Sequence, residues 1–148
     1  MPIKPSSPKN ISILVKTEQQ EAWLNEKEVI FSFRYLDLTN KKFNYNNRNI
    51  DYFHNFIERL RDVSKIRIRD IGAQGKTLRC HPINWDETTE TCFNIPNEEE
   101  IVAGGEFQFA LSSNEHGRIH GFFIGNIFCV VWMDPDHKLY KKKKRSSM

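Results

Sequence analysis

The amino-acid sequence predicts an α+β fold, in which an antiparallel sheet ends in a C-terminal β-hairpin and one main amphipathic helix packs on one face of the sheet. Apolar residues recur at spacings of three and four between Asn49 and Ser64, which is typical of a helix. Residues 29–37 alternate as strands do, and residues 118–132 form apolar segments on both sides of a Gly-Asn turn. The order of strand, helix and further strands favours a helix that covers one face of a sheet.

Residues 1–28 are expected to form an N-terminal arm with short elements. Its first ten residues contain three Pro and two Ser, which favour an extended chain. In the rest of the arm, residues 11–16 fit a short strand and residues 17–27 a short helix capped by Thr17. The first longer strand is predicted to begin at Val29. Its apolar face carries Val29, Phe31, Phe33 and Tyr35.

The main helix is predicted to begin after Asn49, whose side chain is a good N-cap. Asp51 lies in its first turn, where the helix dipole favours a carboxylate. We expect His54 to be a packed or surface histidine beside the core-facing stripe. That stripe is predicted to consist of Ile50, Phe53, Ile57 and Leu60, widened by Phe56 and Val63.

Shorter elements follow the main helix. In chain order the sequence predicts a strand or short helix at 65–71, a strand around Leu78 to Cys80 ended by Pro82, one or two helical turns at 96–103 stopped by Gly104 and Gly105, and a strand at 106–111.

A hairpin with strands Arg118–Ile124 and Ile127–Trp132 ends this series. Gly125 is the first of its two loop residues, which predicts a type II′ turn. Continued without interruption, the register from this turn places His120 opposite Val131. His116, Arg118 and His120 would then share one face of the strand, close to the segment that begins at Asp134.

Length and charge bound the class of protein. With 148 residues the chain has the length of one domain that can bury a core without disulfides, and residues 29–140 are expected to form it. Of the 22 Lys and Arg residues, five form the run 141–145, and the other 17 are balanced by 19 Asp and Glu. The basic character therefore lies in the tail, 141–148, which either adds contacts to phosphate groups or only solubilises the chain end.

Cysteine usage and hydropathy indicate an intracellular protein. Three Cys residues without Cys-x-x-Cys spacing argue against a disulfide framework or a Cys-rich zinc site. The longest apolar run, Ile127 to Met133, is too short to span a bilayer, and the N-terminus has no apolar signal region. We therefore expect a cytoplasmic protein without a membrane partner.

Residues with the chemistry of phosphodiester cleavage gather around the hairpin. A metal-free ribonuclease needs a base for the 2′-hydroxyl, an acid for the leaving oxygen and cations for the phosphate. Candidate catalytic residues of these types are His120, His137, Arg118 and Tyr140. Candidate substrate-binding residues, which combine cations with rings that stack on bases, are Arg79, His81, Trp85, His116 and Lys138. No cofactor is expected, and RNA or another nucleic acid is the expected partner.

Two alternatives remain open from these residues. A metal-dependent hydrolase would use ligands from the set His116, His120, Asp134 and His137. Strand rise separates His116 from His120 by about 13 Å, however, so no metal site is predicted. In the other alternative the protein is not an enzyme but an antitoxin, an inhibitor or an accessory subunit. The aromatic hairpin and basic tail would then dock a protein partner, and Asp134-Pro135-Asp136 would be an ordinary turn.

The segment from His116 to Tyr140 resembles the C-terminal signature of a family of small, largely uncharacterised bacterial proteins found near mobile elements. Those proteins end in an aromatic hairpin followed by W-x-D-P-x-H-x-x-Y, and the likeness covers Leu78–Trp85 and Ser112–Tyr140. The architecture of a helix on a C-terminal antiparallel sheet also looks like the RelE-type toxin endoribonucleases, which act on messenger RNA without metal. This resemblance implies a toxin that cleaves RNA, with Arg118, His137 and Tyr140 at its site.

Overall fold

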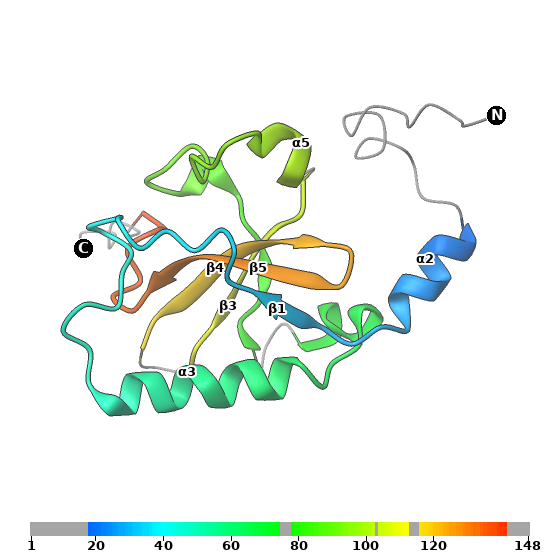
Figure 1. The fold of residues 1–148 in the computed structure, drawn as a ribbon, viewed down its shortest axis with the longest axis horizontal. Helices are drawn as coiled ribbons and strands as arrows, with labels where there is room; N and C mark the ends of the chain where they lie inside the picture. Colours follow the sequence, from blue (N-terminus) through cyan, green and yellow to red (C-terminus); the bar gives the residue numbers. More distant parts are fainter. Residues whose placement is uncertain (1–17, 75–77, 103, 113–115, 142–148) are drawn as a thin grey trace, which may run out of the picture.

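The computed structural model describes residues 18–74, 78–102, 104–112 and 116–141 (Figure 1). The predicted strand at 11–16, the cap Thr17 and nearly all of the basic tail lie outside these residues. The helices are α2 (Glu18–Asn25), α3 (Ile50–Val63) and α5 (Glu98–Val102), with 3₁₀ turns at Ile68–Asp70, Gly72–Gln74 and Trp85–Glu87. The strands are β1 (Ile30–Ser32), β2 (His81–Pro82), β3 (Glu106–Ala110), β4 (Arg118–Ile124) and β5 (Ile127–Asp134).

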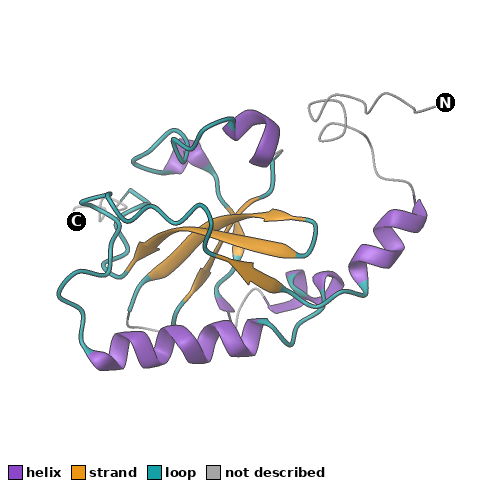
Figure 2. Cartoon of the chain, viewed as in Figure 1, coloured by secondary structure: helices purple, strands orange, loops and turns teal. Residues whose placement is uncertain are grey.

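Within the described residues, five strands form one sheet in the order β1-β5-β4-β3-β2, which confirms the α+β fold. Neighbouring strands are antiparallel except for β1 and β5, which run parallel. The helix α3 lies along one face of this sheet (Figure 1), and loops with α5 lie over the other face (Figure 2). The sheet is therefore the middle layer of the molecule.

The turn of the C-terminal hairpin is the one predicted. Gly125 has a φ of 59°, as the first loop residue of a type II′ turn requires. The register then follows the prediction from the pair Ile124–Ile127 as far as the pair Gly121–Val130. The identity of the turn residues was therefore sufficient to predict half of the hairpin.

Beyond Gly121 the predicted register is wrong. A β-bulge interrupts the hairpin, so that His120 pairs with Trp132 and Arg118 pairs with Asp134. Val131 is the extra residue on β5, and it points to the same side as Trp132, into the cluster of buried side chains under the loops. The bulge shifts every later residue of β5 by one position relative to β4.

The helix α3 has the predicted cap, and its core-facing side is the predicted one only in part: Phe53, Phe56, Leu60 and Val63 pack on the core. The Oδ1 atom of Asn49 accepts a hydrogen bond from the backbone N–H of Tyr52 at 3.1 Å. Two residues of the predicted core stripe, Ile50 and Ile57, are 82% and 63% exposed. The residues of α3 that are buried are Tyr52, Phe56 and Val63. The apolar side chains of this helix form a wide stripe, and the side of it with the rings of Tyr52 and Phe56 fills the space against the sheet.

Three short elements differ from the predictions. β1 is shorter than expected, because the chain turns after it and the N–H of Leu36 donates to the carbonyl of Phe33. Residues 78–80 are not a strand; β2 follows them and contains Pro82, which an edge strand tolerates. Residues 65–71 hold a 3₁₀ turn instead of either predicted element.

The core has two parts, one on each face of the sheet. The cluster under α3 includes Phe56, Phe109 and Ile119, and the cluster under the loops includes Phe43 and Trp132, whose rings stack at 4.5 Å. Among the described helices, none combines the length and the apolar character needed to cross a membrane. Both faces of the sheet are thus buried, and the site described next lies where its strands end.

Candidate functional site

A cleft of about 340 Å³ opens at the end of the sheet where β4 begins and β5 ends. We call it the Arg–His cleft. Its lining residues are Arg79, His116, Gly117, Arg118, Pro135, Asp136 and His137. The structure therefore brings together four of the candidate site residues from three separate segments of the chain. Those four are Arg79, His116, Arg118 and His137.

The backbone around the cleft is unusual. Arg79, His116 and His137 have φ values of 47°, 65° and 54°, in the left-handed region that non-glycine residues seldom adopt. Gly117 has a φ of 70°, and a Cβ atom there would collide with the backbone of Asp134 and Pro135. Glycine thus allows the start of β4 to touch the end of β5, and strained backbone of this kind clusters at functional sites.

Two arginines line the cleft. In the described part of the chain, no ion pair to Asp or Glu involves Arg79 or Arg118. Arg118 is half-buried, and one of its guanidinium N–H groups donates to the carbonyl of Gly117 at 3.1 Å. Burial and the nearby charge of Arg79 lower the pKa of Arg118 from its usual value. Two cations held close together in this way favour an anion between them.

His137 is held by the turn after β5. Its backbone N–H donates to the carbonyl of Asp134 at 3.2 Å. Burial lowers the pKa of His137 below 6.5, the charge of Arg118 lowers it further, and Asp134 opposes both effects. A neutral imidazole is therefore favoured at neutral pH, and a neutral imidazole can accept a proton.

His116 faces the helix α3. Its ring lies edge-on to Tyr52 with centroids 5.7 Å apart, and the side-chain amide nitrogen of Asn55 lies 3.4 Å from its Nε2 atom. Tyr52 and Asn55 therefore lie next to the cleft. Arg48 does so as well, because it pairs with Asp136 at 2.6 Å. Sequence reasoning missed all three, because they lie on or next to a helix and carry no motif that links them to the hairpin.

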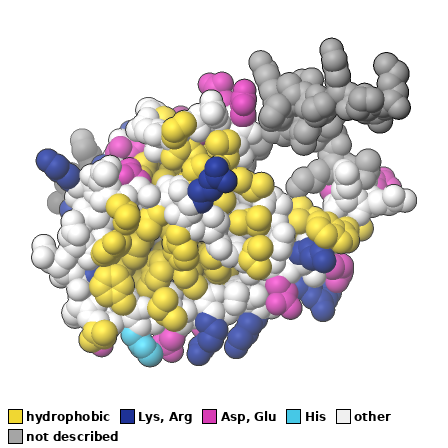
Figure 3. All heavy atoms as spheres, in the orientation of Figure 1, with side chains coloured by type: hydrophobic (Ala, Val, Ile, Leu, Met, Phe, Trp, Pro, Cys, Tyr) yellow, Lys and Arg dark blue, Asp and Glu magenta, His cyan; other side chains and the backbone are white. Residues whose placement is uncertain are grey.

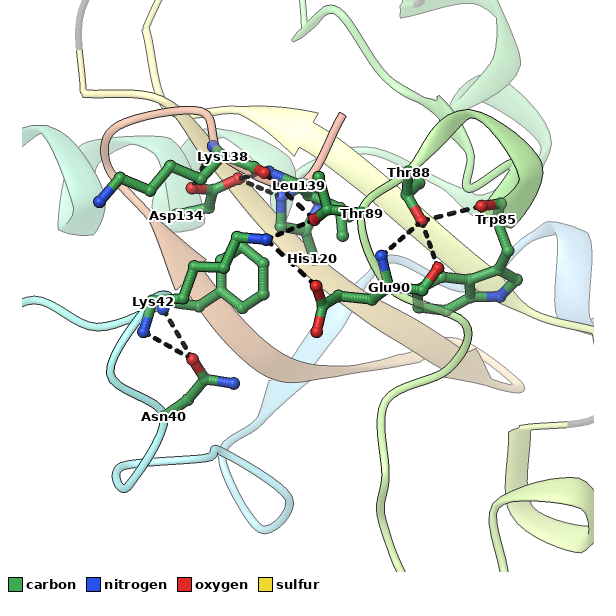
Figure 4. A network of polar contacts seen from close by, with 11 residues as sticks. Asn40, Lys42, Trp85, Thr88, Thr89, Glu90, His120, Asp134, Lys138 and Leu139 are labelled. Atoms are coloured by element: carbon green, nitrogen blue, oxygen red, sulfur yellow. Dashed lines mark hydrogen bonds and ion pairs between the residues drawn. The ribbon is translucent and has the colours of Figure 1, made fainter. Parts of the chain in front are cut away.

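His120 does not line the cleft. Its side chain is completely buried, and its Nε2–H donates to Oδ2 of the equally buried Asp134 at 2.9 Å (Figure 4). Burial lowers the pKa of His120, although the hydrogen bond to Asp134 opposes this. A direct contact between His120 and a substrate, as the sequence analysis proposed, would require this pair to open.

The remaining predicted residues lie apart from the cleft lining. The ring of His81 is edge-on to Tyr140 at 5.6 Å, and the Tyr140 hydroxyl accepts the backbone N–H of Asn84. Lys138 is at the surface, with its Nζ 3.9 Å from Asp136. Trp85 packs against the buried rings of Phe93 and Trp132, so it serves the core. Of this group, His81 and Lys138 are exposed, whereas Tyr140 and Trp85 are half-buried.

A larger hollow of about 660 Å³ lies beside α5. Carboxylates line it, from Glu98, Glu99, Glu100 and Glu106. They would repel an anion, and no histidine or arginine is near them in the lining. The Arg–His cleft is therefore the candidate site, although it is the smaller of the two.

A metal site needs several His, Cys, Asp or Glu side chains around one point. Within the described residues, no group of three or more His, Cys, Asp or Glu side chains is arranged to hold a metal ion. Comparison of the chain with protein-family models, with curated proteins and with solved structures finds no match. The Arg–His cleft is therefore the feature of the molecule that bears on its function.

Proposed function

We propose that the protein acts on nucleic acid, and on RNA in particular, as a metal-independent endoribonuclease of the toxin type carried by mobile elements. The observation that supports this is the Arg–His cleft, in which two arginines that form no ion pair with an Asp or Glu of the described residues lie beside two histidines. Arginine guanidinium groups bind phosphate oxygens in a bidentate way. Imidazole groups can move the protons that phosphodiester cleavage requires.

In this mechanism the RNA 2′-hydroxyl attacks the adjacent phosphorus atom. His137, favoured in its neutral form, accepts the 2′ proton as the new P–O bond forms. Arg79 and Arg118 bind the non-bridging oxygens and stabilise the charge that develops on them. His116 in its protonated form donates a proton to the 5′ oxygen as the old P–O bond breaks. The products are a 2′,3′-cyclic phosphate and a 5′-hydroxyl, and His120 acts only through Asp134.

Other exposed residues extend this site. The edge-on pair of His81 and Tyr140 offers ring faces on which unpaired bases can stack. Lys138 adds a positive charge close to the rim. The substrate that fits these features is single-stranded, because bases must leave the helix to stack on protein rings.

The test is cleavage of a single-stranded RNA by the purified protein in EDTA, with detection of 2′,3′-cyclic phosphate ends. We expect Arg118→Ala and His137→Ala each to lower the rate by about 100-fold or more. His54→Ala is the matched control, because His54 is exposed on α3 and pairs with Glu58. Cleavage that survives in the Arg118 and His137 variants would refute the proposal.

A second candidate function is a non-enzymatic one, as an antitoxin, inhibitor or accessory subunit. The observation that favours it is the apolar surface around α3 and β1, where Ile30, Phe33, Ile50 and Ile57 are exposed (Figure 3). Exposed apolar patches of this kind are typical of protein interfaces. Intact RNA with wild-type protein in the test above would favour this function.

A further inference from the structure

We propose that the buried pair of His120 and Asp134 is a positioning device that fixes the turn after β5 and thereby holds His137 in the Arg–His cleft. This inference rests on the proposed function for its biological meaning. Its structural content concerns the orientation of His137 and can be tested without any RNA.

The carboxylate of Asp134 accepts hydrogen bonds from the backbone of the turn that follows it. Its Oδ1 accepts the backbone N–H of Lys138 at 2.7 Å, and its Oδ2 accepts the backbone N–H of Leu139 at 3.0 Å. The carbonyl of Asp134 accepts the N–H of His137. Three successive backbone N–H groups after Pro135 and Asp136 therefore bond to one residue, which defines the path of the chain through His137.

His120 holds that carboxylate in place. Its Nε2–H donates to the Asp134 oxygen that also accepts from Leu139, and neither side chain touches solvent. In Figure 4 the ring of His120 lies beneath Asp134, Lys138 and Leu139. Without His120, Oδ2 would keep a single donor, and the charge would be buried with less compensation.

The β-bulge makes this pair possible. Side chains on a strand alternate between faces, so a shift of one residue moves a side chain from one face to the other. In the uninterrupted register Asp134 would lie opposite Gly117 and point away from the face of His120. With Val131 inserted, Trp132 pairs with His120, and Asp134, two residues further on, points to the same face as His120.

The pair is poorly explained by stability alone. Removing a charge from water is costly, and well-packed apolar residues of similar size are often as stabilising as a buried ion pair. A carboxylate at this place does what an apolar residue cannot, because it accepts hydrogen bonds from the turn. Its charge also acts on the cleft, since it raises the pKa of Arg118 and of His137 against the effect of their burial.

The test compares three variants by NMR, with the full chain and inorganic phosphate as the probe. His120→Leu removes the donor at similar volume, and His120→Gln keeps an N–H donor near the same place. His54→Leu is the control on α3. We expect His120→Leu to bind phosphate about tenfold more weakly and to show a His137 ring whose pKa moves up towards 6.5. His120→Gln should stay within about twofold of wild type, as the control should.

The outcomes separate this inference from the proposed function. Wild-type phosphate affinity and an unchanged His137 titration in a folded His120→Leu protein would overturn the positioning role, whatever the cleavage assay shows. If His120→Leu weakens phosphate binding and shifts the His137 titration, while the wild-type protein never cleaves RNA, the positioning role is supported and the ribonuclease proposal is refuted. If His120→Leu does not fold, Asp134→Asn replaces it, because the amide keeps the size and one acceptor while it loses the charge.

Discussion

The carboxylate of Asp134 has no contact with solvent, yet it is held in its ionised form. Burial alone would raise its pKa, but the hydrogen bond from His120 and the N–H groups of Lys138 and Leu139 outweigh that effect and lower the pKa. Asp136, two residues later, is its opposite: it lies on the surface and pairs with Arg48. The two carboxylates of one turn therefore have different tasks, one to shape the cleft and one at its rim.

The charge of Asp136 is predicted to weaken the binding of anions in the Arg–His cleft. It is the acidic residue in the lining of the Arg–His cleft, so its charge repels an incoming phosphate and also occupies Arg48. We expect Asp136→Asn to bind inorganic phosphate about threefold to fivefold more tightly, as measured by calorimetry. Asp62→Asn, which breaks an exposed ion pair with Arg61 on α3, is the control and should change nothing. An unchanged or lower phosphate affinity in Asp136→Asn would contradict the inference that the Arg–His cleft binds anions.

The sequence was informative about which residues meet and uninformative about which are exposed. Period-two alternation and the turn at Gly125 were enough to predict that Arg118, His116 and the segment after Asp134 converge. They could not predict that His120 is buried, because that depends on loops that cover its face. Arg48 and Asn55 reach the cleft through the packing of α3, which no local pattern encodes.

At the scale of elements, the hairpin shows where a sequence pattern stops being sufficient. The turn residues determine the register close to the turn. The bulge falls in a run, Cys129 to Trp132, in which every residue is apolar, so no alternation marks the point where the faces exchange. The same ambiguity affects α3, whose apolar residues exceed the width of one face; packing against the sheet, not periodicity, selected Tyr52 and Phe56 as its buried residues.

The tight packing of Gly121 beside the bulge predicts that even a methyl group at this position destabilises the protein. A Cβ atom at Gly121 would collide with the carbonyl oxygen of Cys129 and would lie 2.9 Å from the ring of Phe128. Both neighbours are fixed by the pairing of β4 with β5, so we expect Gly121→Ala to lower the free energy of unfolding by about 3 kcal/mol in urea denaturation. Gly72→Ala is the matched control, because nothing lies within 4 Å of a Cβ there, and it should stay within about 0.5 kcal/mol. Equal stability of the two variants would show that the bulge is absent.

At the scale of the whole molecule, both faces of one sheet are covered by apolar clusters, and polar groups enter the interior at few points. Asp134, His120 and Gln108 are among these buried polar residues, and they belong to β5, β4 and β3. The amide N–H of Gln108 donates to Nε2 of His81 at the surface. The polar groups thus form a row across the sheet that ends at its exposed edge strand.

The two histidines with lowered pKa predict how stability depends on pH. Burial lowers the pKa of both His120 and His137 below 6.5, so the unfolded chain binds protons more readily than the folded one. The stability is complete above pH 6.5 and is lost as the pH falls from 6.5 through the lower folded-state pKa values. We expect the free energy of unfolding to decrease between pH 7 and pH 5, with a smaller decrease in His137→Gln. A stability that rises on acidification over this range would contradict the lowered pKa of the two rings.

The parallel pairing of β1 with β5 has a consequence for the way the protein is made. β1 and α3 leave the ribosome early, whereas the strands they pack against, β3 to β5, lie in the last third of the chain. At about 10 residues per second, roughly ten seconds separate the synthesis of β1 from that of its partner strand. During that time Phe31, Tyr52 and Phe56 have no sheet to cover them, so this part of the chain can fold only after β3 to β5 have been synthesised. Apolar side chains that stay exposed for that long favour aggregation of the nascent chain.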